Sequence, residues 1–112
     1  MIKGADVLIL GVAYKKDVDD LRESPALDVM ELLVEKSARV TYSDPHVPCF
    51  ALKGHQMKSV PLTPVLLKKA DLVVILTDHK AFDYPLVVRH APLIFDTRNA
   101  LRNIKAGHVE RL

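Results

Sequence analysis

Two uninterrupted apolar runs, residues 7–12 and 72–76, limit most strongly what this chain can fold into. A strand on the surface of a sheet alternates apolar and polar residues, whereas a strand covered on both faces is apolar throughout. Both runs have the length of strands, not of helices. They therefore predict two central strands of a parallel sheet that is covered on both faces.

A capping residue followed by proline marks two expected helix starts. Ser24 precedes Pro25, and Thr63 precedes Pro64. A Ser or Thr hydroxyl accepts a hydrogen bond from an amide of the first turn, and proline at the first helical position loses no hydrogen bond there. The sequence predicts one helix that starts at Pro25 and a short one over residues 64–69.

Further elements complete an alternating order. Residues 39–43 indicate a strand that stops at Asp44-Pro45, and residues 93–95 indicate the last strand. A third helical segment is expected from Thr77-Asp78 to about His90, with Asp78 as its cap and His79 in its first turn. Residues 49–60 are ambiguous.

This alternation predicts one α/β domain over residues 1–112, with a Rossmann-like three-layer arrangement: a parallel sheet, right-handed crossovers and helices on both faces. Such sheets bind ligands beyond the carboxyl ends of their strands. The loops after Val12, Ser43, Leu76 and Phe95 are therefore the expected binding loops.

A highly charged segment, residues 13–27, follows the first strand. It lacks the three glycines of a dinucleotide fingerprint. Lys15 and Lys16 are suited to neutralise phosphate or to bind sugar hydroxyls, and the guanidinium of Arg22 is suited to bidentate phosphate binding. Taken without any family resemblance, the residues favour a plainer role, in which these cations pair with acidic neighbours on a solvated loop.

A second polar cluster, Asp96 to Asn99, follows the last expected strand. If that strand lies near the first one, Arg98 and Lys15 could converge on one ligand. Alternatively, Arg98 pairs with Asp96 or with a helix carbonyl, and Asp96 caps the turn after the strand.

Composition excludes several classes of protein. The formal net charge of +2 is spread along the chain, without the basic stripe of a nucleic-acid-binding protein. No apolar run has the length of a membrane span, so we expect a cytoplasmic protein. Cys49, the single cysteine, has no base at a recognisable spacing, and His46, Cys49 and His55 lack a fourth ligand for zinc, so no metal site is predicted.

Several ordered motifs resemble one enzyme family. Tyr14-Lys15-Lys16-Asp17 and the following Asp20-Leu21-Arg22-Glu23-Ser24 resemble elements of the C-terminal UDP-sugar-binding domain of the UDP-glucose/GDP-mannose dehydrogenase family. Asp44-Pro45, Ala70-Asp71 with its apolar strand, and Asp96 to Asn99 match further elements of that domain. Tyr14 and the segment of residues 20–27 are most similar to the enzymes acting on UDP-N-acetylglucosamine.

The resemblance implies an NAD-dependent oxidation of the C6 hydroxyl of a UDP-sugar to a carboxylate. It places Lys15 and Tyr14 at the sugar, Arg98 at the hydroxyls or phosphates of the nucleotide sugar, and Arg22 near the NAD pyrophosphate. The family's catalytic cysteine and NAD fingerprint lie in other domains, so the isolated chain is not expected to oxidise a substrate. We expect a truncated or separately occurring monomeric domain whose partners are the UDP-sugar and the NAD-binding and central domains of a parent enzyme.

Two other kinds of protein are weighed against this interpretation. A receiver-like signalling module needs an acidic cluster after the first strand to hold magnesium, and Tyr14-Lys15-Lys16 stands there instead. A free-standing NAD-binding domain could use Asp44 to hold a ribose, but it would need the absent glycines.

Overall fold

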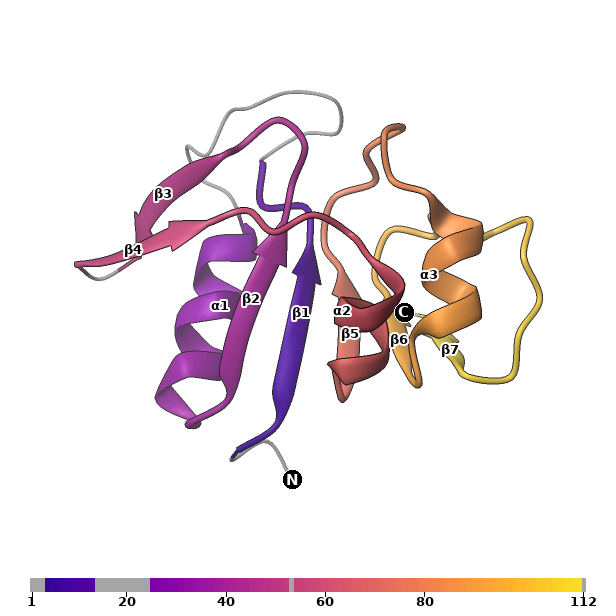
Figure 1. The fold of residues 1–112 in the computed structure, drawn as a ribbon, viewed down its shortest axis with the longest axis horizontal. Coiled ribbons are helices and arrows are strands. Elements are labelled where there is room, and N and C mark those ends of the chain that lie inside the picture. Colours follow the sequence, from indigo (N-terminus) through magenta and orange to yellow (C-terminus); the bar gives the residue numbers. More distant parts are fainter. Residues whose placement is uncertain (1–3, 14–24, 53, 112) are drawn as a thin grey trace.

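The computed structural model of the chain describes residues 4–13, 25–52 and 54–111, which form a layered α/β structure (Figure 1). The strands and helices are, in chain order, β1 (Asp6–Leu10), α1 (Pro25–Glu35), β2 (Arg39–Ser43), β3 (Cys49–Leu52), β4 (His55–Lys58), α2 (Pro64–Lys69), β5 (Leu72–Ile75), α3 (Tyr84–His90), β6 (Ile94–Asp96) and β7 (Val109–Arg111).

The main sheet has five strands in the order β2-β1-β5-β6-β7. All four neighbouring pairs are parallel, with Leu8 opposite Val73 and Val73 opposite Ile94. Both apolar runs therefore lie inside the sheet, β1 between β2 and β5, and β5 between β1 and β6. The predicted α/β class, with a parallel sheet, is confirmed.

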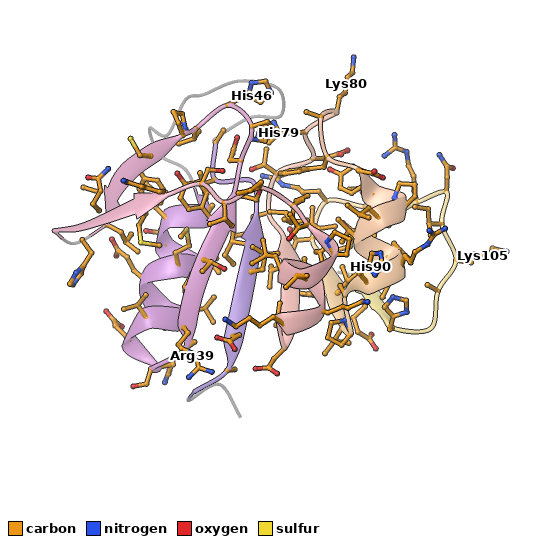
Figure 2. All side chains as sticks on the ribbon, viewed as in Figure 1. Arg39, His46, His79, Lys80, His90 and Lys105 are labelled. Carbon is orange, nitrogen blue, oxygen red and sulfur yellow. The ribbon has the colours of Figure 1, made fainter. Side chains whose placement is uncertain are left out.

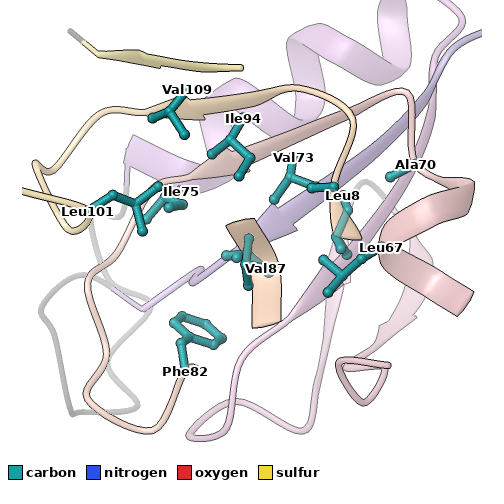
Figure 3. Close-up of a cluster of buried hydrophobic side chains, with 12 residues drawn as sticks. Leu8, Leu67, Ala70, Val73, Ile75, Phe82, Val87, Ile94, Leu101 and Val109 are labelled. Carbon is teal, nitrogen blue, oxygen red and sulfur yellow. The ribbon is translucent and has the colours of Figure 1, made fainter. Parts of the chain in front are cut away.

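Successive side chains of each strand point to opposite faces of the sheet and pack in two separate hydrophobic cores. One face of the sheet packs under α2 and α3, as Figure 3 shows for Leu8, Ile75 and Val87. The opposite face packs under α1 and the β3–β4 hairpin, with Ile9 and Met30 fully buried. Since burying one such side chain is worth about 1.5–3 kcal/mol, the apolar character of β1 on both faces stabilises both layers.

Two helices begin where the sequence predicts. α1 begins at Pro25, and the expected cap Ser24 lies outside the described residues. α2 begins at Pro64, and Thr63 Oγ1 accepts a hydrogen bond of 3.2 Å from the amide of Leu66. The cap-then-proline pattern thus fixes the start of α2 through one side-chain contact.

The third helix begins later than predicted, so that expectation is wrong. α3 starts at Tyr84, and its cap is Asp83, whose carboxylate accepts from the amide of Leu86. Asp78 instead accepts a hydrogen bond of 2.7 Å from the Tyr84 hydroxyl, and His79 is buried. Asp83 followed closely by Pro85 provides the stronger helix start, which leaves residues 77–83 as a loop.

Three further strands were not predicted. The ambiguous residues 49–60 contain an antiparallel hairpin of β3 and β4. Phe50 of β3 packs against Tyr42, with ring centroids 5.0 Å apart. β7 joins the sheet beside β6. The sheet therefore extends one strand beyond the predicted last strand. Within the described residues, no helix is long and apolar enough to cross a membrane.

Candidate functional site

The strand order places a topological switch point between β1 and β5. The chain leaves β1 toward β2 on one side and leaves β5 toward β6 on the other. In open parallel sheets the crevice at such a point, beyond the carboxyl ends, is the usual ligand site. Figure 2 shows His46, His79 and Lys80 at this end of the sheet and Arg39 at the opposite end.

The exits of β1 and β5 approach each other closely at Gly11. Its backbone has a φ of +87°, and a Cβ atom there would lie 2.5 Å from Thr77 Cβ and 2.7 Å from the Thr77 carbonyl oxygen. The Thr77 hydroxyl donates a hydrogen bond of 2.8 Å to the carbonyl of Ala13. The positive φ of Gly11 departs from extended backbone, so β1 ends at Leu10 instead of continuing to Val12.

Asp44 joins three strand exits through one buried carboxylate. Its Oδ2 accepts hydrogen bonds from the amides of Val12 (2.8 Å) and Ala13 (3.1 Å) after β1 and contacts Nε2 of His79 (2.9 Å) after β5. Its Oδ1 accepts from the amide of His46, the second residue after it (2.8 Å). The side chains of Asp44 and His79 are both 0% exposed.

These contacts set the charge state of Asp44. Burial by itself raises the pKa of the carboxyl, but the hydrogen bonds from His79 and from the amides of Val12 and His46 outweigh it and hold the pKa below its ordinary value. The ring of His46 packs against that of His79, with centroids 4.7 Å apart. The buried anion is thus stabilised by fixed donors, as a buried charge requires.

The fourth exit carries Arg98. Asp96 caps the turn after β6, because its carboxylate accepts from the amides of Arg98, Ala100 and Leu101. The Arg98 side chain is exposed, and its Nε donates a hydrogen bond of 2.9 Å to the carbonyl of Leu76. The capping alternative is confirmed for Asp96. The Arg98 side chain is held by a carbonyl just after β5, not by a helix carbonyl.

Only part of the predicted site can be located. Tyr14, Lys15 and Arg22 lie outside the described residues, as does the rest of the segment of residues 14–24. Arg98 lies at the carboxyl edge, where the exits of β1, β2, β5 and β6 gather as predicted. β6 is separated from β1 by β5, and Leu76 of the β5 exit is the residue that Arg98 contacts.

The same contacts argue against a dinucleotide site at this edge. The close approach that Gly11 allows is taken by Thr77, and the carboxylate of Asp44 is buried among protein donors and does not face a ribose. The described residues therefore do not fit a NAD pyrophosphate and ribose at the exits of β1 and β2. Among the described residues, moreover, no three His, Cys, Asp or Glu side chains gather as a metal site would need.

A cleft of about 550 Å³ opens between the segments that follow β2, β4 and β5, a volume within the range of small-ligand sites. Its walls combine hydroxyl groups with apolar and proline side chains. The lining residues are Ser43, Pro45, Ser59, Val60, Pro61, Leu62, Ala81, Phe82, Asp83 and Leu86.

Sequence reasoning missed His79 and Thr77 as parts of this edge. Both lie in the loop after the apolar run of residues 72–76, whereas Asp44 directly follows its own strand. Loops that follow the parallel strands of one sheet meet at its carboxyl edge, and this rule brings the loops after β2 and β5 to the same edge although β1 lies between these strands. The expected helix start at Asp78 placed His79 in a first turn and so hid its pairing with Asp44.

The sheet order and its switch point place the chain among the doubly wound, Rossmann-like α/β domains. Within that class, the model of the UDP-glucose/GDP-mannose dehydrogenase family, UDP binding domain, matches residues 8–103, and the chain belongs to this family.

Curated relatives and solved structures agree with this assignment. The chain is 33% identical to the UDP-N-acetyl-D-mannosamine dehydrogenase of Methanococcus maripaludis over 91% of its length and 24% of that protein's. It is 33% identical to the UDP-glucose 6-dehydrogenase of Rickettsia prowazekii over 91% of its length and 25% of that protein's.

Among solved structures, the UDP-D-ManNAc dehydrogenase of Pyrococcus horikoshii is similar, with a TM-score of 0.75 and 26% identity over 97% of this chain and 25% of that one. The UDP-N-acetyl-mannosamine dehydrogenase of Staphylococcus aureus has a TM-score of 0.71 and 33% identity over 96% of this chain and 26% of that one. The chain thus spans about a quarter of the length of these relatives.

Proposed function

We propose that this chain is the C-terminal, nucleotide-sugar-binding domain of a larger NAD-dependent UDP-sugar 6-dehydrogenase. Its role is to bind the UDP-sugar at the carboxyl edge of the sheet while the C6 hydroxyl is oxidised to a carboxylate. The observation that carries the proposal is Arg98, an exposed guanidinium held at the β5 exit beside the switch point. The match to a UDP-binding-domain model supports it.

Arg98 is proposed to bind the phosphates or hydroxyls of the nucleotide sugar. Fixing its Nε on the Leu76 carbonyl restricts the direction of the planar guanidinium, whose two terminal nitrogens suit bidentate phosphate binding. On the family resemblance, Lys15 and Tyr14 would contact the sugar, and Arg22 would lie near the NAD pyrophosphate. NAD itself would be held mainly by a domain outside this chain.

The substrate is proposed to be a UDP-N-acetylhexosamine. The sequence motifs favour UDP-N-acetylglucosamine, whereas the relatives are dehydrogenases of its C2 epimer, UDP-N-acetyl-D-mannosamine, and of UDP-glucose. The N-acetyl group is common to the first two. Binding of UDP-glucose more tightly than either N-acetylated sugar would contradict this part of the proposal.

The partners follow from the same proposal. The NAD-binding and central domains of the parent enzyme would face the carboxyl edge and complete the site, and the isolated chain would be a monomer of the cytoplasm. Because half of the ligand's surroundings would come from those domains, we expect millimolar affinity of this chain for the UDP-sugar.

The test is an NMR titration of the 112-residue chain, in which amide shifts are followed with UDP and with the three UDP-sugars. NAD, and magnesium with acetyl phosphate, serve as comparison ligands. Shifts that centre on Ala13, Leu76 and Arg98 and saturate with a UDP-N-acetylhexosamine would support the proposal. A response only to magnesium with acetyl phosphate would favour a receiver-like module, and one only to NAD would favour a dinucleotide-binding domain.

Substitutions of Arg98 and of Arg89 test the proposed role of Arg98 in the same titration. Arg98→Ala should weaken UDP-sugar binding by at least about tenfold, since a charge-assisted hydrogen bond contributes about 1.5–3 kcal/mol and 1.4 kcal/mol corresponds to a factor of ten. Arg98→Lys should recover only part of the affinity, because it keeps the charge without the planar pair of nitrogens. Arg89→Ala, at an exposed arginine in the last turn of α3, is the matched control and should leave binding unchanged.

A further inference from the structure

The cleft between the segments that follow β2, β4 and β5 has a floor that is buried and partly polar. Ser43, the last residue of β2, and Phe82 both line it, and each is 6% exposed. Tyr42 packs in the core under α1, so the next side chain of the strand, Ser43, points to the opposite face of the sheet. Figure 3 shows Phe82 in the core cluster of that face, with Val87. The cleft therefore opens on the side of the sheet that α2 and α3 cover.

The hydroxyl of Ser43 has no hydrogen-bond partner among the described residues, although its main-chain carbonyl accepts from the amide of Gly11 at 3.0 Å. Within that part of the chain, every side-chain oxygen or nitrogen that is shut off from solvent has a partner. The Ser43 hydroxyl is therefore open to solvent, through the cleft that Ser43 lines. An unpaired hydroxyl on a residue that is otherwise buried is a hydrogen-bonding group available to a molecule in the cleft.

The other polar side chains of the cleft offer acceptors. The exposed carboxylate of Asp83 uses Oδ1 to accept from the amide of Leu86 at 3.1 Å, which leaves Oδ2 available. The Ser59 hydroxyl accepts from the amide of Asp44 at 2.9 Å and donates to the carbonyl of Asp44 at 3.2 Å, so its proton is already used. Among the described residues that line the cleft, none is Lys, Arg or His. The cleft thus carries one negative charge and no cation.

Most main-chain amides of the lining residues cannot supply donors either. Pro45 and Pro61 have no amide hydrogen. The amides of Ser59, Val60 and Phe82 donate to carbonyls within the protein. A phosphate or carboxylate in the cleft would meet mainly acceptors and a like charge, whereas an ammonium group, which only donates, would meet the partners that it requires.

We propose that this cleft binds a small organic amine, in which a protonated amino group is carried on an apolar body of about one ring. The carboxylate of Asp83 balances the charge of the amino group, and the Ser43 hydroxyl accepts one of its hydrogen bonds. The apolar body lies on Leu62, Leu86 and the ring of Phe82, which also attracts a cation. This inference does not rest on the proposed function, because a UDP-sugar needs the opposite charge preference.

The experiment uses three probes that share one body and differ in charge. Phenethylamine is a cation, 2-phenylethanol is neutral and phenylacetate is an anion. Each is titrated into the full 112-residue chain while the amide shifts of Ser43, Ser59 and Phe82 are followed. Phenethylamine should bind with a Kd on the order of 1 mM, as a ligand of this size allows. 2-Phenylethanol should bind about threefold more weakly, the scale of one exposed ion pair, and phenylacetate more weakly still.

Two substitutions and a control test the assigned groups. Asp83→Asn keeps a residue that caps α3 about equally well, and it should abolish the preference for the amine over the alcohol. Ser43→Ala should weaken binding of phenethylamine about fivefold, the scale of one neutral hydrogen bond. Asp28→Asn, at an exposed carboxylate of α1 on the other side of the sheet, is the matched control and should leave all three Kd values unchanged.

Three results would overturn the proposal. The first is binding of phenylacetate as tight as that of phenethylamine. The second is a preference for the amine that persists in Asp83→Asn, because the charge that selects the ligand would then lie elsewhere. The third is the lack of saturable shifts at Ser43, Ser59 and Phe82 with phenethylamine.

Discussion

Replacing Gly11 with alanine tests how closely the exits of β1 and β5 must approach. Two separate costs are expected. A φ of +87° lies where a Cβ atom costs about 1–2 kcal/mol. The new methyl group would also lie 2.5 Å from Thr77 Cβ and 2.7 Å from the Thr77 carbonyl oxygen, and no rotation of the Thr77 side chain moves either atom away.

The steric cost follows from the size of that overlap. Inserting one carbon into a packed region typically costs about 1–3 kcal/mol, because the backbone has to move. Together with the conformational cost, Gly11→Ala should lower the free energy of unfolding by about 2–5 kcal/mol. This is a large part of the stability of a small domain, which is typically about 5–15 kcal/mol.

Urea unfolding of wild type, Gly11→Ala and Gly54→Ala, monitored by circular dichroism, separates the conformational cost from the steric cost. Gly54→Ala is the matched control, since Gly54 has a φ of +82° but nothing within 4 Å of the added Cβ. It should lose only the conformational part, about 1–2 kcal/mol. Equal losses in Gly11→Ala and Gly54→Ala would refute the claim that the Thr77 contact makes glycine necessary after β1.

Four other variants test the buried carboxylate, the core and the cap of α2. Folding lowers the pKa of Asp44, so the stabilisation by its carboxylate is complete above about pH 4 and is lost as the pH falls through the folded-state pKa. Asp44→Asn has no such group to protonate. Its urea midpoint should therefore fall less than that of wild type between about pH 6 and about pH 3. Leu8→Ala, in the core under α2 and α3, should cost about 2–5 kcal/mol of unfolding free energy, and a loss below 1 kcal/mol would contradict its burial. Thr63→Ala should cost about 1 kcal/mol by removing the cap of α2, and Thr63→Ser should restore most of it in the same assay.

Four of the five strands of the sheet, all except β7, could be predicted because they carry their signal in a few consecutive residues. A run without polar residues, as in β1 and β5, has no face to expose, so it has to be central. The hairpin of β3 and β4 gave no comparable signal. Its residues are mostly exposed, and its one buried side chain is Leu52, so no periodicity marks it as a strand pair.

The carboxyl edge was predicted as a place but not as a set of contacts. Arg98 was assigned to it from its position after the last expected strand, and the structure locates Arg98 there. The pairing of Asp44 with His79 depends on the order of the strands in the sheet, where β1 lies between β2 and β5, and these residues are 35 positions apart in the chain. Patterns within a few consecutive residues do not show which strand ends meet. The expected helix start at Asp78 also hid the role of His79.

The donors to Asp44 have a consequence for how the molecule becomes ordered. They come from residues 12 and 13, from residue 46 and from residue 79, so the carboxylate has all its partners only after three distant stretches of chain have come together. Until then it is better left hydrated, because dehydration without donors is costly. The ends of β1, β2 and β5 should therefore become ordered in one concerted event, and hydrogen exchange at the amides of Val12, Ala13 and His46 should report one common free energy of opening.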